Sequence, residues 1–270
     1  MVSLRSGHPH TVQRRSAIYG DQVRRDADVG GGRRARALGP GPGPEIPTAQ
    51  TPTAQTPTGE PGGDVTSSVG VGPWDGPWPE GPEYDPDLLA RGDSRNVVDR
   101  YRYWTREAIV ADLDGRRHPL HVAVENFAHD FNIGSVVRTA NAFAVAEVHI
   151  VGRRRWNRRG AMVTDRYQHL RHHDDVGALA SWARGRGLPL LGVDNLPGAV
   201  PLETFDLPRA CVLVLGQEGP GLSEAARDGC AEVLSIAQFG STRSINAGAA
   251  AAIAMHAWVR RHVFGQAPAR

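Results

Sequence analysis

The sequence predicts an α/β protein with a mostly parallel sheet covered by helices on both faces. From about Asn96 onward, short runs rich in Val, Leu and Ile alternate with helical stretches, a pattern typical of parallel strands joined by helices. Gly and Pro instead crowd the first ninety or so of the 270 residues. We therefore expect a tail or linker over residues 1–92 and one folded domain over residues 93–265, long enough to bury roughly two thirds of its unfolded surface.

The tail is expected to be disordered, first Arg-rich and then rich in Pro, Gly and Thr. Residues 1–40 hold eight arginines and three aspartates without helical or strand periodicity. From Pro47 the chain repeats PTAQT and continues to Trp74 and Trp78, a composition typical of extended or polyproline conformations. Three interpretations stay open: a tail without its own activity, an accessory RNA-binding arm, and a strap in which the tryptophans pack back on the domain.

The elements of the domain follow in a regular order. Asp93 and Ser94 precede one amphipathic helix, in which apolar residues recur at helical spacing as far as Val110. Strands are expected at 120–126, 147–152, 188–195, 211–216 and 232–237. Helices are expected at about 134–143, near 176–186, after Leu222, and from about Ser244 to Val263.

Composition narrows the class of protein. No run of about 18 apolar residues is present, which excludes an ordinary membrane-spanning helix. The first residues, MVSLRSGHPHTVQRRS, contain arginines without an apolar segment behind them, so no secretory signal is expected. Cys211 and Cys230 show neither CxxC spacing nor a disulfide framework, which favours a cytoplasmic location.

The basic residues are all arginines. The chain contains 31 of them and no lysine, which excludes lysine chemistry. The planar guanidinium suits phosphate recognition better than a point charge does. A bias in genome composition is the alternative explanation of this residue usage.

Three polar loops follow predicted strands and form the candidate ligand site, because ligands of open α/β sheets bind outside the carboxyl ends of the strands. They are NFAHDFNIGSVVRTANAF after the first strand, GQEGPGL after CVLVLG, and AQFGSTRSINAG after EVLSIA. Each loop is rich in Gly, Asn, Ser or Gln and leads into a helix. None of them supplies an obvious general base.

In the first loop, Asn132 is expected to cap the helix that begins at Gly134. Ser135, Arg138 and Asn141 then form a polar stripe beside the apolar face of that helix. This stripe is either a solvated face or a surface that directs Arg138 at a phosphate or another anionic substrate.

The other two loops are built from glycines and small polar residues. GQEGPGL surrounds Glu218 with glycines, which lets a ligand approach the backbone closely, although an ordinary tight turn has the same composition. It matches neither a P-loop nor a dinucleotide fingerprint. In the third loop, Ser244 or Asn246 can cap the last helix.

Arginines also gather around Trp156 and Tyr167 in residues 152–173. Arginines contact phosphates and aromatic rings stack on unpaired bases, so this segment favours nucleic acid over a merely solvated face. Candidate RNA-binding residues are Arg153, Arg154, Arg155, Trp156, Arg158, Arg159 and Arg166. His169, His172, His173, Asp174 and Asp175 lie nearby, but the adjacent pair His172 and His173 lacks the i, i+4 helical geometry of zinc sites, so no metal is expected.

Taken in order, the three loops resemble the motifs of the SpoU (TrmH) branch of the SPOUT methyltransferases, over about residues 120–260. The resemblance implies transfer of a methyl group from S-adenosylmethionine to a ribose 2′-hydroxyl of tRNA or rRNA, by a homodimer with a C-terminal deep trefoil knot. It assigns the catalytic centre to Asn132, Arg138, Glu218, Ser244 and Asn246. It assigns cofactor binding to the backbone around Leu215, Gly216, Gly219, Ile236 and Ile245.

The chain also departs from the family pattern. The third motif commonly reads S-L-N-V-S and here reads S-I-N-A-G over residues 244–248, so its last hydroxyl is missing. The family proposal makes the arginine the base, yet guanidinium stays protonated in proteins. We therefore interpret Arg138 as a clamp on the phosphate beside the reacting ribose, with the proton passing to water or phosphate. The alternative function is a catalytically silent RNA-binding protein on the same scaffold.

Overall fold

The computed structural model describes residues 70–126, 132–217 and 219–268. Residues 1–69, which carry most of the predicted tail, and Glu218, one of the predicted catalytic residues, lie outside this described part of the chain.

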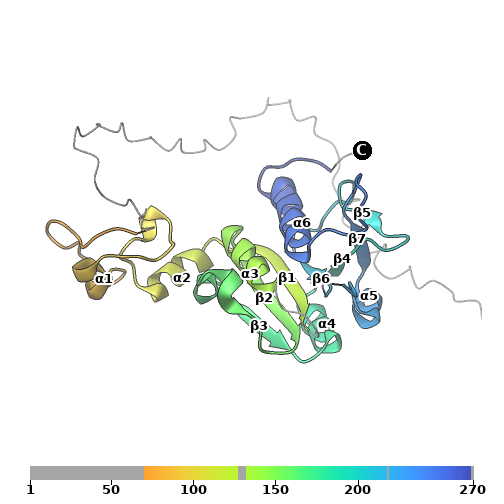
Figure 1. Cartoon of the computed structure of the whole chain (residues 1–270), viewed down its shortest axis with the longest axis horizontal. Helices are drawn as coiled ribbons and strands as arrows, with labels where there is room; N and C mark the ends of the chain where they lie inside the picture. The colour runs from red at the N-terminus through yellow and green to blue at the C-terminus, as the bar shows by residue number, and fades with distance from the viewer. Residues whose placement is uncertain (1–69, 127–131, 218, 269–270) are drawn as a thin grey trace, which may run out of the picture. The chain divides into compact units, whose positions relative to one another are not determined.

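In the described part of the chain, seven parallel strands form one sheet in the order β3-β2-β1-β6-β4-β7-β5 (Figure 1). The strands are β1 (His118–Asn126), β2 (Val145–Gly152), β3 (Leu170–His173), β4 (Leu190–Val193), β5 (Val200–Pro201), β6 (Cys211–Leu215) and β7 (Glu232–Ser235). The predicted α/β class with a parallel sheet is confirmed. Two strands were not predicted, because β3 reads LRHH with a single apolar residue and β5 is only two residues long.

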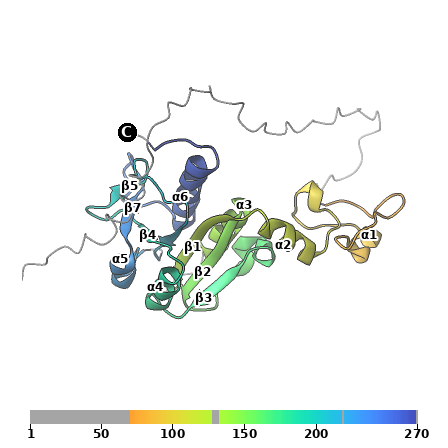
Figure 2. The same cartoon turned by 180° about the vertical axis from the view of Figure 1, so that it is seen from behind.

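Helices cover both faces of the sheet. On β1, Leu120, Val122 and Val124 belong to a core shared with α3 (Ile133–Ala142) and α6 (Ala247–His262). Ala123 belongs to a second core shared with α4 (Val176–Arg184) and α5 (Glu224–Gly229). Both views place α6 at the top of the sheet and α4 and α5 at the bottom (Figures 1 and 2). This alternation along β1 is the period of two that a strand buried on both faces requires.

The long helix α6 is fixed to the sheet by its largest side chain. Trp258 is fully buried, and its Nε1 donates to the carbonyl oxygens of Pro208 and Arg209, at 3.1 Å each. The buried residues on the rest of its inner face are small or flexible, chiefly Ala251, Ala254 and Met255. None of the helices in the described ranges is both long and apolar enough to cross a membrane.

The segment before the sheet differs from its prediction. One continuous helix was expected after Ser94, but the chain forms a short turn η1 (Asp99–Tyr101) and then α2 (Arg106–Asp114). Thr105 begins α2, because its side chain accepts a hydrogen bond from the Ala108 amide at 3.1 Å. An N-cap residue has non-helical backbone angles, which is why the helix cannot run through this position.

Residues 70–92, which the sequence-based prediction assigned to the tail, are also folded. They include α1 (Pro86–Arg91) and an antiparallel bridge between Val71 and Asp93. The ring of Trp74 packs edge-on against Tyr103, with centroids 5.4 Å apart, as expected for a strap.

The carboxylate of Asp93 holds this strap together. It is fully buried and accepts hydrogen bonds from the Arg95 guanidinium at 2.7 Å and the Tyr103 amide at 3.0 Å. Burial alone raises the pKa of Asp93, but these bonds outweigh it and lower the pKa to about 2. The carboxylate is therefore charged and satisfied inside the fold.

Candidate active site

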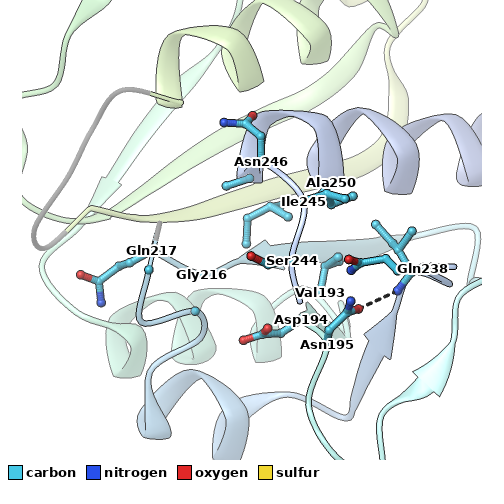
Figure 3. A pocket seen from close by; sticks show the side chains of 15 residues that line it. Val193, Asp194, Asn195, Gly216, Gln217, Gln238, Ser244, Ile245, Asn246 and Ala250 are labelled. Carbon is cyan, nitrogen blue, oxygen red and sulfur yellow. Dashed lines mark hydrogen bonds between the residues drawn. The ribbon is translucent and has the colours of Figure 1, made fainter. Parts of the chain in front are cut away.

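A cavity of about 330 Å³ lies at the carboxyl ends of β4, β6 and β7 (Figure 3). Three loops and the first turns of α6 contribute its walls, which mix apolar and polar side chains. The lining residues are Val193, Asp194, Asn195, Leu215, Gly216, Gln217, Gly219, Gly221, Ile236, Gln238, Ser244, Ile245, Asn246, Ala247 and Ala250. Because ligands of open α/β sheets bind at this edge, the cavity is the candidate small-molecule site.

The cavity brings together residues that sequence analysis assigned to separate motifs. All five predicted cofactor residues line it, together with the predicted catalytic residues Ser244 and Asn246. Four polar lining residues were not predicted: Asp194, Asn195, Gln217 and Gln238. Asp194 and Asn195 directly follow β4, so the strand-end rule applied to LPLLGVDN would have found them.

The glycine-rich loop after β6 is a closed backbone turn. Gln217 and Gly221 exchange two backbone hydrogen bonds, of 2.9 and 3.0 Å. A Cβ atom on Gly216 would lie 2.2 Å from the carbonyl carbon of Gly221, so only glycine fits there. Gly221 has a positive φ of +73°, a conformation that also favours glycine. These glycines let the loop fold tightly against the cavity.

Two side chains after β4 connect the neighbouring loops. Asp194 Oδ2 accepts a hydrogen bond from the Leu222 amide at 2.8 Å. Asn195 Oδ1 accepts one from the Ile236 amide at 3.1 Å (Figure 3). The loops after β4, β6 and β7 are therefore held in one arrangement before any ligand arrives.

Gln238 offers the cavity an acceptor. Its side-chain Oε1 is buried and has no hydrogen-bond partner among the described residues. A buried polar oxygen without a partner is costly. A donor group on a bound ligand can satisfy it, which makes Gln238 a candidate ligand-binding residue.

Asn246 joins the third motif to the first. Its Oδ1 accepts hydrogen bonds from the Gly248 amide at 2.9 Å and the Ala249 amide at 3.2 Å, so Asn246 caps α6 as predicted. Its Nδ2 donates to Asn132 Oδ1 at 2.9 Å.

The predicted capping role of Asn132 is wrong. Its side chain makes no capping hydrogen bond to the start of α3 in the described part of the chain. Its backbone angles, φ −90° and ψ −16°, are helical rather than the extended angles of a capping residue. Asn132 instead connects the loop after β1 to the start of α6 through Asn246.

Arg138 lies outside the cavity lining, exposed on α3. It forms no hydrogen bond or ion pair with another described residue. One turn earlier on the same helix, Ser135 lies beside the first turn of α6, where a Cβ on Gly248 would be 3.4 Å from Ser135 Cβ. The guanidinium is therefore free to meet an anionic ligand that approaches the α3 surface.

The arginine-rich segment is anchored beside α3. Asn126, at the end of β1, donates hydrogen bonds to the carbonyl oxygens of Arg153 and Arg155, at 2.6 and 3.0 Å. Glycines allow the segment to touch the start of α3, since a Cβ on Gly134 would lie 2.7 Å from Gly160 Cα. This contact brings the turn η2 (Arg158–Ala161) next to the motif that carries Asn132.

The predicted RNA-binding side chains divide into two groups. The arginines are exposed: Arg153, Arg154, Arg155, Arg158, Arg159 and Arg166. Trp156 is half-buried against the core that β1 shares with α3 and α6, and the Arg158 guanidinium lies 5.6 Å from its ring centroid. Tyr167 is buried with Tyr101 and Ile109, so its expected role as a base-stacking ring is wrong.

The fold and the site together define an α/β protein with a small-molecule cavity at its strand ends and an arginine-rich surface nearby. Residues 119–256 match the model of the SpoU rRNA Methylase family. The chain therefore belongs to this family. The sequence-based assignment to the SpoU RNA methyltransferases is confirmed.

Relatives of known name agree with this membership. The chain is 27% identical over 156 residues to a tRNA (guanosine(18)-2′-O)-methyltransferase of Escherichia coli (strain K12), covering 56% of this chain and 68% of that protein. It is 33% identical over 165 residues to an uncharacterized tRNA/rRNA methyltransferase of Mycobacterium avium (strain 104), covering 58% of this chain and 52% of that protein.

Solved structures share the fold. The A. aeolicus TrmH/SpoU tRNA modifying enzyme superposes with a TM-score of 0.53 at 21% identity, over 59% of this chain and 84% of that chain. The SpoU methyltransferase AviRb from Streptomyces viridochromogenes, solved with AdoMet, gives a TM-score of 0.51 at 24% identity, over 57% of this chain and 62% of that chain.

Proposed function

We propose that this protein is an S-adenosylmethionine-dependent methyltransferase that methylates a ribose 2′-hydroxyl in tRNA or rRNA. The single observation that carries the proposal is the cavity in which the second and third family motifs meet, with the first motif bonded to its edge through Asn132 and Asn246. The names of the relatives, one of them a tRNA ribose 2′-O-methyltransferase, support the same reaction.

The residues of the cavity fit the cofactor. A volume of about 330 Å³ lies within the range of small-molecule sites, roughly 300–1,000 Å³. Leu215, Ile236 and Ile245 offer apolar walls for a purine ring, and Gln238 Oε1 offers an acceptor for an amino or hydroxyl group. When bound, S-adenosylmethionine supplies a methyl group on a sulfonium that is already an activated leaving group, so methyl transfer requires no metal ion.

The catalytic centre comprises Asn132, Arg138, Glu218, Ser244 and Asn246. Arg138 holds the phosphate beside the reacting ribose, orients the 2′-hydroxyl and stabilises the negative charge that develops on its oxygen. The proton leaves to water or to that phosphate, because guanidinium is not a base in proteins. The bond between Asn132 and Asn246 keeps the first and third motifs in one relative position during the reaction.

The exposed arginines of residues 153–166 bind the phosphates of the RNA. Their position beside the start of α3 supports a path for the RNA backbone that leads to Arg138. The half-buried Trp156 supplies an apolar edge to the same surface.

The family also implies features of assembly and chain path. We infer a homodimer that uses part of α6, where exposed Ile253 lies beside a second cavity of about 260 Å³ with His256 and Ala257 in its wall. We infer a deep trefoil knot in the C-terminal part, in keeping with loops after β6 and β7 that converge on one cavity. An RNA substrate of this kind supports a cytoplasmic location.

The function is tested by mapping 2′-O-methyl sites by mass spectrometry in tRNA and rRNA from cells with and without the gene. The proposal predicts one or more ribose methyl groups that disappear when the gene is removed. If no site changes and the purified protein binds RNA but no S-adenosylmethionine in calorimetry, the protein is a catalytically silent RNA-binding relative.

A further inference from the structure

Three histidines from neighbouring strands form a row on the α4 side of the sheet. His121 of β1 lies with its Nδ1 3.1 Å from Nε2 of His149 on β2. His149 Nδ1 in turn lies 3.0 Å from Nε2 of His173 on β3. None of these residues lines the active-site cavity. The row is therefore a polar feature of the second core that the proposed methyl transfer does not use.

A carboxylate completes the cluster. His121 pairs with Glu147 in the register of β1 and β2, and His149 follows two residues later, so all three side chains project from one face. Glu147 Oε2 lies 3.9 Å from His149 Nε2. One ligand atom from each of the three residues falls within 4.8 Å of the others.

These separations suit a four-coordinate zinc ion. Bonds of about 2.0–2.2 Å to tetrahedral zinc place any two ligand atoms roughly 3.3 Å apart. The observed 3.1 and 3.9 Å lie on either side of that distance and the remaining pair lies within 4.8 Å, so side-chain movements of up to roughly 1.5 Å bring all three atoms into place. Two imidazoles and one carboxylate are a donor set that zinc accepts, with one position open to water.

The surroundings would orient these ligands. With His149 Nε2 on the ion, its Nδ1–H donates to His173, the outer-shell bond that ligating histidines usually make. Arg171 Nε donates to Glu147 at 3.1 Å. The Trp182 ring covers His149 with centroids 4.3 Å apart, and its Nε1–H is buried without an acceptor among the described residues. A water ligand of the ion could accept from this N–H.

We propose that His121, Glu147 and His149 bind one Zn²⁺ ion per chain, which cross-links β1 and β2 beneath α4. This site lies apart from the methyl-transfer machinery and goes beyond the proposed function. No sequence motif marks this site, because its ligands come from two strands that only the fold brings together.

The test uses the full-length protein without an affinity tag, stripped by a chelator and titrated with Co²⁺ and Zn²⁺. We expect one Co²⁺ per chain with the visible spectrum of tetrahedral coordination, displaced by Zn²⁺. We expect Zn²⁺ at about a hundredfold above its Kd to raise the thermal midpoint by roughly 5–10 °C. Both effects should be lost in His149→Gln and in Glu147→Gln. They should persist in His169→Gln, which changes an exposed histidine bonded to Asp114.

Circular dichroism checks that each variant folds. If His149→Gln does not fold, Glu147→Gln decides, because that side chain is partly exposed and its loss leaves the core intact. Absence of the Co²⁺ spectrum and of any Zn²⁺ shift in the wild-type protein would overturn the proposal and leave three neutral imidazoles joined by N–H···N bonds. Unchanged binding in both cluster variants would overturn it as well.

Discussion

Asn246 donates a hydrogen bond from Nδ2 to Oδ1 of Asn132 at 2.9 Å, which joins two motifs that lie 114 positions apart in the chain. The same Asn246 side chain caps α6 through its Oδ1. One residue therefore fixes both the start of α6 and the position of α3, the helix that carries Arg138.

Replacing Asn246 with Ala should remove the cap and the bond between motifs together. We expect the free energy of unfolding to fall by about 1–2 kcal/mol, and by about 1 kcal/mol in Asn132→Ala, which loses the bond between the motifs but keeps the cap of α6. Urea unfolding of the two single variants and the double variant measures the coupling, which should be about 0.5–1.5 kcal/mol. Purely additive losses would show that the bond contributes nothing.

Gly216→Ala should damage the cofactor site through the backbone. The new Cβ would lie 2.2 Å from the Gly221 carbonyl carbon, so the loop after β6 must move. We expect a stability loss of about 1–3 kcal/mol and a large loss of S-adenosylmethionine affinity in calorimetry. Gly240→Ala is the matched control, because no atom lies within 4 Å of a Cβ at that position. Equal affinity in the two variants would argue against a cofactor bound at this loop.

The arginine-rich segment should determine the salt dependence of RNA binding. Changing Arg154, Arg155, Arg158 and Arg159 together to Ala removes up to four phosphate contacts. Each lost contact lowers the slope of log K against log salt by about 0.7–0.9. S-adenosylmethionine affinity should stay the same. The double variant Arg184→Ala/Arg227→Ala, on α4 and α5, serves as the control, and a slope that is equal in both variants would make the segment an ordinary solvated surface.

The N-terminal strap should respond to acid through Asp93. Its pKa falls from 3.8 to about 2 on folding, so the unfolded chain takes up the proton first as the pH drops. The ionised Asp93 carboxylate contributes about 2 kcal/mol to the free energy of unfolding. This contribution is complete above pH 3.8 and is lost as the pH falls toward 2. The unfolding free energies of wild type and Asp93→Asn should therefore differ at pH 6 and converge near pH 2, as followed by tryptophan fluorescence. A difference that does not depend on pH would contradict this account.

Much of the fold could be predicted because buried parallel strands are nearly continuous apolar runs. The five predicted strands all exist, and β6, CVLVL, is buried at every residue. β3 was not predicted because its two histidines and one arginine interrupt the apolar run expected of a buried strand, although its backbone pairs with β2 in register. The sequence did not predict that the first helix is interrupted at Thr105, because the helical spacing of apolar residues continues across this capping residue.

Site residues could be predicted where they belong to a recognisable sequence motif. They were harder to predict where only the three-dimensional fold brings them to the site. Ser244 and Asn246 stand in a recognisable loop and line the cavity. Gln238 stands in the same loop, but its importance depends on a buried oxygen that no sequence pattern reveals. Tyr167 was expected at the RNA surface because arginines surround it in sequence. In the folded chain its side chain is instead buried in a hydrophobic cluster with Tyr101.

The most direct test of ribose methylation is single-turnover transfer of a labelled methyl group from S-adenosylmethionine to RNA purified from cells that lack the gene, followed by digestion to nucleosides. The account predicts label in a 2′-O-methylnucleoside with the wild-type protein. Arg138→Ala should be slower by roughly ten- to several-hundredfold, the equivalent of about 1.5–3 kcal/mol, with near-normal cofactor binding and no full rescue in Arg138→Lys. Label on a base, or no label in RNA, would contradict ribose methylation, and a wild-type rate in Arg138→Ala would contradict the role of Arg138 as a phosphate clamp.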